Sequence, residues 1–306
     1  MAYTKAEFER VRQEAQGWRV APEEGKFLPM WRHRMCDAEG GRITISAGDY
    51  RVGVTATPTY FDVYGWHDAP GLPARVELEF VDRIRDGRAK AEITFWNERG
   101  FGLNGAWSEG EVDWVTGRGR FALNLELGQE TVAARKGVVE GAVGTLMAMV
   151  LRDGGVLLHA ATLEVDGCAV VVVGASGRGK STLCRRFPSH FMNEEFAFLS
   201  PTGPGGSWQS HWYAQERAAA TERPPVLPLG GLFLLSERRD RSAAWRATTA
   251  DALTVLHSSS LWVPGIPVEI HLAAHESLLS RHPPRSMSHS LTSCDADVLG
   301  VLRSLT

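Results

Sequence analysis

The chain has 306 residues, a formal net charge of −3 at pH 7 and an apolar content of 43%. This length allows a substantial buried core and favours two domains over one. The sequence has no block of lysine and arginine residues and no apolar run near the roughly 20 residues that cross a bilayer, so nucleic acid and membrane are excluded as partners. The four cysteines stand far apart and form no CxxC pair, which predicts reduced thiols in a cytoplasmic protein.

The first part of the chain, residues 1–128, is expected to form an antiparallel, β-rich domain. Residues 75–80 alternate strictly, with Val76, Leu78 and Phe80 on one face and charged residues on the other. This pattern predicts a half-exposed antiparallel strand. Further strands are expected at 42–47, 59–64, 91–96 and 121–127, separated by turns that contain glycine and proline.

The second part, residues 129–306, is expected to form an α/β domain. Apolar residues recur at three- and four-residue steps from 131 to 152, which predicts a helix. Two strands are expected around the Asp166-Gly167 turn, a typical hairpin pattern. These strands are 156–165 and 168–173, and they are followed by a helix at 179–187, strands at 196–199 and 229–235 with a loop region at 201–228 between them, and short helices with an extended segment near 286–291 after residue 250.

A phosphate-binding loop follows the apolar strand that ends at Val173. The sequence GASGRGKS at 174–181 fits the pattern G-x-x-x-x-G-K-[ST], whose glycines let backbone N–H groups surround an anion at a helix N-terminus. The alternative is a chance glycine-rich turn, against which the order of strand, loop and helix argues. The lysine would reach the β- and γ-phosphates, and the serine hydroxyl would contact the metal. The predicted ligands are ATP and Mg²⁺, and the predicted nucleotide-binding residues are Gly174, Ala175, Ser176, Gly177, Arg178, Gly179, Lys180, Ser181 and Thr182.

The residues on either side of this loop resemble the HPr serine kinase family. The most specific part of the resemblance is Leu157-Leu158-His159-Ala160-Ala161, followed by a hairpin and then the phosphate loop. Residues 191–199 look like the short acidic segment of the family, and residues 228–235 look like its next core strand. The resemblance runs from near Val156 to the C-terminus and implies an HPr kinase-like P-loop domain.

The resemblance also implies roles for four side chains. Glu194 would take the proton from the target serine or face the metal, and His159 would lie beside the transferring phosphoryl group. Glu195 would face the metal together with Ser181, whose metal contact the loop pattern also predicts. From the residues alone, the pair Glu194-Glu195 would be read as a solvated acidic pair and His159 as a core histidine. The family carries an aspartate where this chain has Glu194, and one added methylene moves the carboxylate by about an ångström, enough to alter catalysis.

Two functions therefore stay open for the second domain. The first is a Mg²⁺–ATP-dependent serine kinase that acts on a peptide or small protein. The second is a catalytically degenerate kinase homologue that binds a peptide. A simple ATPase or GTPase ranks last, because no apolar strand ending in an obvious metal-binding aspartate follows the loop.

The layout of the first domain resembles bacterial relatives encoded with ribosomally made peptide natural products, in which some members phosphorylate or recognise the precursor peptide. Four tryptophans stand close together in this domain, and they are open to two interpretations: core packing, or anchors for an extended peptide that adds to the sheet as a strand. They are Trp66, Trp96, Trp107 and Trp114. HPr kinases are hexameric as a family, so the resemblance is also compatible with a homo-oligomer.

Overall fold

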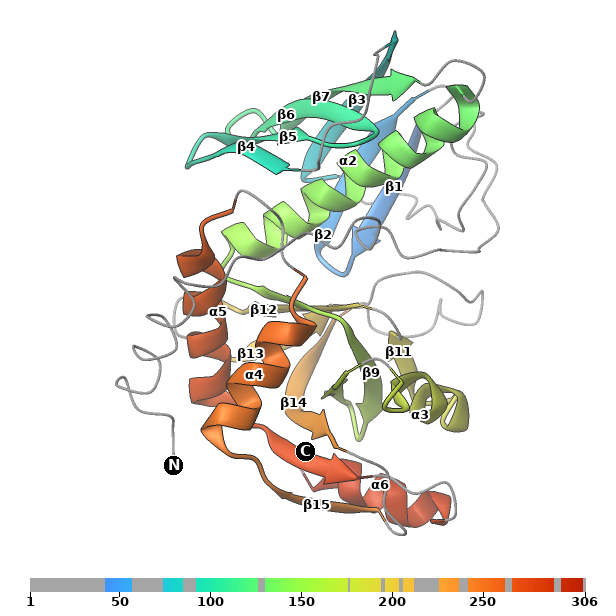
Figure 1. Cartoon of the computed structure of the whole chain (residues 1–306), viewed down its shortest axis with the longest axis vertical. Helices are drawn as coiled ribbons and strands as arrows, with labels where there is room; N and C mark the ends of the chain where they lie inside the picture. The colour runs from blue at the N-terminus through green and yellow to red at the C-terminus, as the bar shows by residue number, and fades with distance from the viewer. Residues whose placement is uncertain are drawn as a thin grey trace.

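Two mixed β-sheets and five helices make up the described part of the chain in this computed structural model, which is an α/β structure with a sheet-rich N-terminal region (Figure 1). Within that part, no helix is long and apolar enough to cross a membrane. The structure describes residues 42–56, 74–84, 92–125, 130–175, 177–193, 196–203, 206–211, 226–236, 242–261, 266–288 and 293–304.

The first sheet has seven strands in the order β1-β2-β3-β7-β6-β5-β4. The strand β3 buries Val76, Leu78 and Phe80, as its alternation predicts, but it pairs in parallel with both of its neighbours. The prediction of a fully antiparallel domain is therefore wrong, because alternation reports which face of a strand is buried and not the direction of its neighbours. The strands are β1 Arg42–Ala47, β2 Tyr50–Thr55, β3 Val76–Ile84, β4 Glu92–Trp96, β5 Gly100–Asn104, β6 Ser108–Asp113 and β7 Arg118–Leu125.

One long helix, α2 (Glu130–Arg152), covers one face of this sheet on the side toward the second sheet (Figure 1). The helix shares a continuous apolar core with the strands, to which it contributes Val138, Ala142 and Leu146. The carboxylate of the half-buried Glu140 accepts hydrogen bonds from the backbone N–H groups of three consecutive residues, Ala106, Trp107 and Ser108, at 2.8–3.1 Å. By packing, α2 therefore belongs with the strands that precede it, and the domain boundary at residue 128 stays a prediction.

The second sheet has nine strands, seven of which follow one another in the order β11-β9-β10-β14-β13-β12-β8. The hairpin of β9 and β10 is confirmed, with Asp166 and Gly167 in the left-handed region at φ 49° and 79°. The strands are β8 Val156–Leu158, β9 Ala160–Val165, β10 Cys168–Val173, β11 Phe191–Asn193, β12 Ala197–Pro201, β13 Trp208–His211, β14 Val226–Leu235, β15 Ala243–Arg246 and β16 Arg285–Ser288.

Helices cover both faces of this second sheet (Figure 1). Along β10, Val171 and Val173 pack in a cluster with α4 and α5, whereas Val170 and Val172 pack in a cluster with α3 and α6. Burial on both faces explains why this strand is apolar at nearly every position. The helices are α3 Lys180–Arg186, α4 Thr249–Ser259, α5 Val268–Arg281 and α6 Asp295–Arg303.

Two expected elements differ in the structure, and a third lies outside the described residues. The expected strand at 156–165 is broken at His159, because β8 pairs with β12 while β9 pairs with β10 and β11. The expected loop region at 201–228 contains β13 and the start of β14. The expected strand at 59–64 lies outside the described residues.

Candidate functional site

The phosphate-loop sequence lies between β10 and α3, as predicted. Its strand is buried throughout from Ala169 to Val173, and the helix begins at Lys180. Gly177 and Gly179 have φ values of 78° and 104°, in the left-handed region that other residues rarely adopt. The glycines thus permit a backbone path around residues 177–179 that a side chain would strain.

Lys180 turns back over the loop. Its side chain is buried, and its Nζ donates hydrogen bonds to the carbonyl oxygens of Gly174, at 2.6 Å, and Ala175, at 3.4 Å. Moving this ammonium group from the backbone carbonyls to a bound anion would cost little free energy, because a phosphate oxygen is a stronger hydrogen-bond acceptor than a carbonyl oxygen. The lysine is therefore already located where the pattern requires a positive charge.

The loop starts in a close contact between two neighbouring parallel strands. A Cβ atom on Gly174 would lie 3.1 Å from both the Cβ and the carbonyl oxygen of Leu235, at the end of β14. This distance is tighter than an ordinary van der Waals contact, so the first position of the loop fits glycine best.

His159 lies at the corner between β8 and β9, next to the start of the loop. Its neighbour Ala160 pairs with Val173, the last residue of β10, so the two chain segments meet where the loop begins. The His159 backbone N–H donates to the Ser259 carbonyl at 2.6 Å, and the side chain is half-buried. The structure thus brings this predicted site residue to the phosphate loop through strand pairing.

Three of the predicted site residues lie outside the described residues: Ser176, Glu194 and Glu195. The strand β11 ends just before the two glutamates, where Asn193 pairs with Thr162 of β9 and donates from its side chain to the His211 carbonyl at 3.1 Å. The remaining loop residues Arg178, Ser181 and Thr182 are half-buried.

A magnesium ion fits this loop through Ser181 only together with phosphate oxygens. In the described ranges, no three His, Cys, Asp or Glu side chains gather in a way that could hold a metal. Magnesium bound to a nucleotide typically takes one or two protein ligands and completes its shell with phosphate and water. The hydroxyl of Ser181, in the first turn of α3, is the described group that would hold it, and the metal would supply charge neutralisation for the phosphates.

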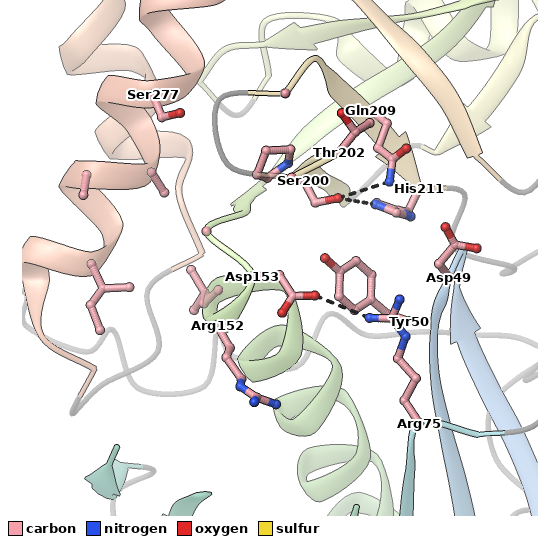
Figure 2. Close-up of a pocket in the computed structure, with 18 of the residues that line it drawn as sticks. Asp49, Tyr50, Arg75, Arg152, Asp153, Ser200, Thr202, Gln209, His211 and Ser277 are labelled. Carbon is pink, nitrogen blue, oxygen red and sulfur yellow. Dashed lines mark hydrogen bonds and ion pairs between the residues drawn. The ribbon is translucent and has the colours of Figure 1, made fainter. Parts of the chain in front are cut away.

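A second site lies in a cleft of about 1050 Å³ between the first sheet and the second (Figure 2). It is lined by the β1–β2 turn, the end of α2, the β4–β5 turn, strands β12 and β13, and one face of α5. The centre of its polar wall is Ser200, whose Oγ lies 2.7 Å from Nε2 of His211 and 3.5 Å from Nε2 of Gln209. Both Ser200 and His211 are buried.

Tyr50 connects this wall to the first sheet. Figure 2 shows its ring between the pair of Ser200 and His211 on one side and the pair of Arg75 and Asp153 on the other. The Tyr50 ring meets the His211 ring edge-on at 4.9 Å, and the Arg75 guanidinium stacks over it at 5.1 Å. Arg75 also forms an ion pair with Asp153 at 3.4 Å. Side chains from both sheets therefore share one polar network.

Burial shifts the pKa values of two groups in this network. Burial raises the pKa of the Tyr50 hydroxyl to about 12, although a hydrogen bond with Ser200 partly opposes the shift. Burial lowers the pKa of His211 to about 4, although the charge of Asp49 partly opposes it. Both groups are therefore neutral at pH 7. The second ring nitrogen of His211, Nδ1, is a buried polar atom that has no hydrogen-bond partner among the described residues.

The sequence alone did not indicate this cleft. Its polar residues come from separate strands, and no short spacing connects Tyr50 with Ser200 or His211. The tryptophans gave a partial indication: Trp96 lines the cleft, whereas Trp114 is buried and stacks on Phe101 at 5.2 Å. Trp107 is half-buried beneath Lys136, whose Nζ lies 4.4 Å from its ring, and Trp66 lies outside the described residues.

Comparison with known proteins returned no match, either to a protein-family model or to a curated protein. The resemblance to HPr serine kinases therefore rests on the sequence segments at 157–161, 191–199 and 228–235 alone.

Proposed function

We propose that the chain is a Mg²⁺–ATP-dependent serine kinase-like protein that acts on a peptide or small protein. The observation that carries this proposal is the phosphate loop: a buried parallel strand, two glycines with positive φ, and a lysine turned into the loop at the start of a helix. This combination provides backbone N–H groups and one positive charge for the phosphates. The three described cysteines are free thiols, which agrees with a cytoplasmic setting.

In the proposed reaction, the serine hydroxyl of the substrate attacks the γ-phosphorus of ATP. The new bond joins the serine oxygen to phosphorus, the bond from the γ-phosphorus to the bridging oxygen breaks, and ADP leaves. The hydroxyl proton passes to Glu194, in the role that the resemblance implies. Lys180 stabilises charge on the phosphate oxygens, and His159 lies beside the loop where the phosphoryl group would transfer.

The alternative is a degenerate kinase homologue that binds a peptide without phosphorylating it. The specific observation in its favour is the large cleft between the two sheets, which offers a binding surface separate from the loop. Under this alternative, the loop would bind nucleotide without transfer, or would serve the fold alone.

Calorimetry with ATP and Mg²⁺ tests the nucleotide site. We expect the Lys180→Ala variant to bind ATP about a hundredfold more weakly than the wild type, because a charged hydrogen-bond donor to phosphate is lost. The matched control is Lys136→Ala, which removes a lysine from the face of α2 and should leave ATP affinity unchanged. Equal ATP binding by the wild type and Lys180→Ala would contradict the proposal, as would no binding at all.

Transfer is measured on the same samples with γ-labelled ATP and a pool of serine-containing peptides. Label on peptide serine that disappears in both Lys180→Ala and Glu194→Gln supports the kinase. Nucleotide binding without any transfer favours the peptide-binding homologue. Label that persists in Glu194→Gln at the wild-type rate would remove Glu194 from the role of base.

A further inference from the structure

A serine and a histidine in the cleft wall are held together by the pairing of two strands. Along β12 and β13, Ser200 pairs with Gln209 and Phe198 pairs with His211, so the side chains of Ser200 and His211 lie diagonally on one face. Oγ of Ser200 lies 2.7 Å from Nε2 of His211, and both residues line the cleft. This distance is within the reach of about 2.6–3.2 Å that joins a serine nucleophile to its base.

The other ring nitrogen of His211 faces the β1–β2 turn. A Cβ atom on Gly48 would lie only 2.4 Å from this Nδ1, so the turn packs against the edge of the ring and has no room for a larger residue. Nδ1 is a buried polar atom without a hydrogen-bond partner among the described residues. Such an atom costs free energy in a folded protein and calls for an explanation, of which a catalytic role is one.

Asp49 is the acidic group next to this nitrogen. It follows Gly48 in the turn, and Figure 2 shows Asp49 and Ser200 on opposite sides of the His211 ring. The charge of Asp49 acts on His211, where it partly opposes the effect of burial on the pKa. A rotation of the exposed Asp49 side chain would let its carboxylate accept the Nδ1 proton. Nucleophile, base and orienting group would then stand in one row.

Two further side chains surround the Ser200 hydroxyl and are hydrogen-bond donors. Nε2 of Gln209 lies 3.5 Å from Oγ, and the Tyr50 hydroxyl forms a hydrogen bond with Ser200. Tyr50 keeps its proton at pH 7, because burial raises its pKa to about 12. The carbonyl oxygen of an acyl group on Ser200 would lie near these donors, which would stabilise a negative charge on it as an oxyanion hole does.

The lining of the cleft indicates a neutral substrate with an apolar part. Carboxylates and guanidinium groups both line it, so the cleft selects neither an anion nor a cation. One face of α5 supplies an apolar wall, which consists of Ile270, Ala273 and Ala274. The volume of about 1050 Å³ is at the upper end of the range of about 300–1,000 Å³ that is usual for small-molecule sites.

The Ser200 hydroxyl is far from the phosphate loop. Gln209, opposite Ser200, pairs with Pro228 near the start of β14, whereas Val173, just before the loop, pairs with Leu234 near the end of the same strand. Six residues of extended chain separate Pro228 from Leu234, which corresponds to about 20 Å. Chemistry at Ser200 would therefore be independent of the triphosphate.

We propose that Ser200 is a nucleophile for neutral carboxylic esters, with His211 as its general base and Asp49 as the positioning residue of His211. Oγ attacks the ester carbonyl carbon while its proton passes to Nε2, and the bond to the alcohol oxygen breaks as the alcohol leaves with that proton. Water then attacks the acyl group and gives a proton to Nε2. The carboxylic acid leaves, and Ser200 regains its hydroxyl proton from His211.

A fluorophosphonate probe tests the nucleophile directly. It forms a covalent bond from phosphorus to an activated serine oxygen as fluoride leaves, and mass spectrometry of peptides locates the labelled residue. We expect a single label on Ser200 in the folded wild type and no label in Ser200→Ala. The matched control is Ser280→Ala, which changes an exposed serine of α5 outside the cleft and should be labelled at the wild-type rate. A wild type without label, or with its label on another serine, would overturn the proposal.

Hydrolysis of p-nitrophenyl butyrate tests the base and the positioning residue. We expect His211→Gln to lower kcat at least about a hundredfold, as for loss of a general base. Asp49→Asn should lower kcat at least about tenfold with KM unchanged, and Asp49→Glu should recover part of the loss. A merely structural role would change the free energy of unfolding without this split between kcat and KM. An unchanged kcat in His211→Gln would overturn the proposal, and an unchanged kcat in Asp49→Asn would remove Asp49 from it.

One further variant separates this activity from the proposed kinase. Lys180→Ala should hydrolyse the ester, without nucleotide, at the wild-type rate, so a failed kinase assay and a failed esterase assay give different results. An ester hydrolysis that disappears in Lys180→Ala while the variant stays folded would place the reaction at the phosphate loop and contradict the proposal.

Discussion

The two sheets differ in how many of their faces are covered by helices. Among the described residues, helix α2 covers one face of the seven-stranded sheet, and the other face carries exposed charged residues such as Glu79, Glu111 and Arg120. The nine-stranded sheet is covered on both faces, by α4 and α5 on one and by α3 and α6 on the other. A strand in the first sheet therefore loses water from one face only, whereas β10 and β14 lose it from both.

This difference in burial determines which positions of the two sheets can tolerate substitution. In the first sheet, Glu79 on β3 is exposed, so its substitution should have little effect on stability. In β14, the consecutive residues Leu232 and Phe233 are both fully buried although they point to opposite faces. The described histidines add to the contrast, because all of them follow β8 and several are buried. The two regions should thus respond differently to pH and to substitution.

The largest expected difference is the response to acid. Burial lowers the pKa of His211 and of His271 to about 4, and burial together with the charges of His271 and His257 lowers the pKa of His275 to about 3. These values lie below the usual 6.5, so between pH 6.5 and about 4 the unfolded chain binds protons that the folded chain does not. These histidines therefore leave the free energy of unfolding unchanged above pH 6.5 and lower it as the pH decreases below that value.

The size of this effect follows from linkage. Between pH 6.5 and its folded-state pKa, each of these histidines lowers the free energy of unfolding by about 1.4 kcal/mol for each pH unit. Three of them can therefore lower it by several kcal/mol at pH 5. Urea unfolding at a series of pH values measures it, and the His271→Leu variant should show a shallower dependence. A free energy of unfolding that stays constant from pH 7 to pH 5 would show that these rings are not neutral and buried.

The next largest difference concerns two-sided burial in β14. We expect Leu232→Ala and Phe233→Ala each to lower the free energy of unfolding by about 2–5 kcal/mol, because each leaves a cavity in a different face of the sheet. The matched pair in the first sheet is Leu78→Ala and Glu79→Ala, of which only the first should be costly. If one β14 variant proves neutral, the corresponding face of the second sheet is not packed as described.

A third prediction concerns the hydrogen bonds between Glu140 of α2 and the backbone of the turn before β6. Glu140→Ala should destabilise the chain by about 2–3 kcal/mol, because three partly buried backbone N–H groups lose their acceptor. Glu140→Gln keeps one acceptor oxygen and should recover part of the loss. Equal stability of both variants and the wild type, measured by urea unfolding, would indicate that water replaces the carboxylate.

The smallest expected effect is on the exposed face of the first sheet. Glu79→Ala removes an ion pair with Arg120, whose Nε lies 3.8 Å from the carboxylate with both side chains largely exposed. Exposed ion pairs contribute about 0–1 kcal/mol, so the midpoint of thermal unfolding should shift by no more than about two degrees. A large destabilisation would mean that another part of the chain covers this face.

The sequence predicted the elements whose pattern is local. Alternation located the buried face of β3, the turn residues located the hairpin of β9 and β10, and the glycine-rich pattern located the loop before α3. These features depend on residues within about ten positions of one another, so the chain displays them directly.

What could not be predicted depends on pairing between distant segments. The parallel neighbours of β3 are set by how the chain crosses over, which alternation does not record. The break at His159 arises because β8 and β9 find different partners, although the sequence continues as one apolar run. The cleft needs the β1–β2 turn, the end of α2 and β13 together, and no spacing in the sequence connects them.

The parallel pairing of β10 with β14 also sets the order in which the second sheet can assemble. The hairpin of β9 and β10 can close as soon as residue 173 is made, but β14 begins about fifty residues later, and such non-local parallel pairing is intrinsically slow. Until then, one edge of the uncharged strand Cys168–Val173 stays open to pairing with other chains. During synthesis, this valine-rich edge is therefore a place where the incomplete chain can aggregate.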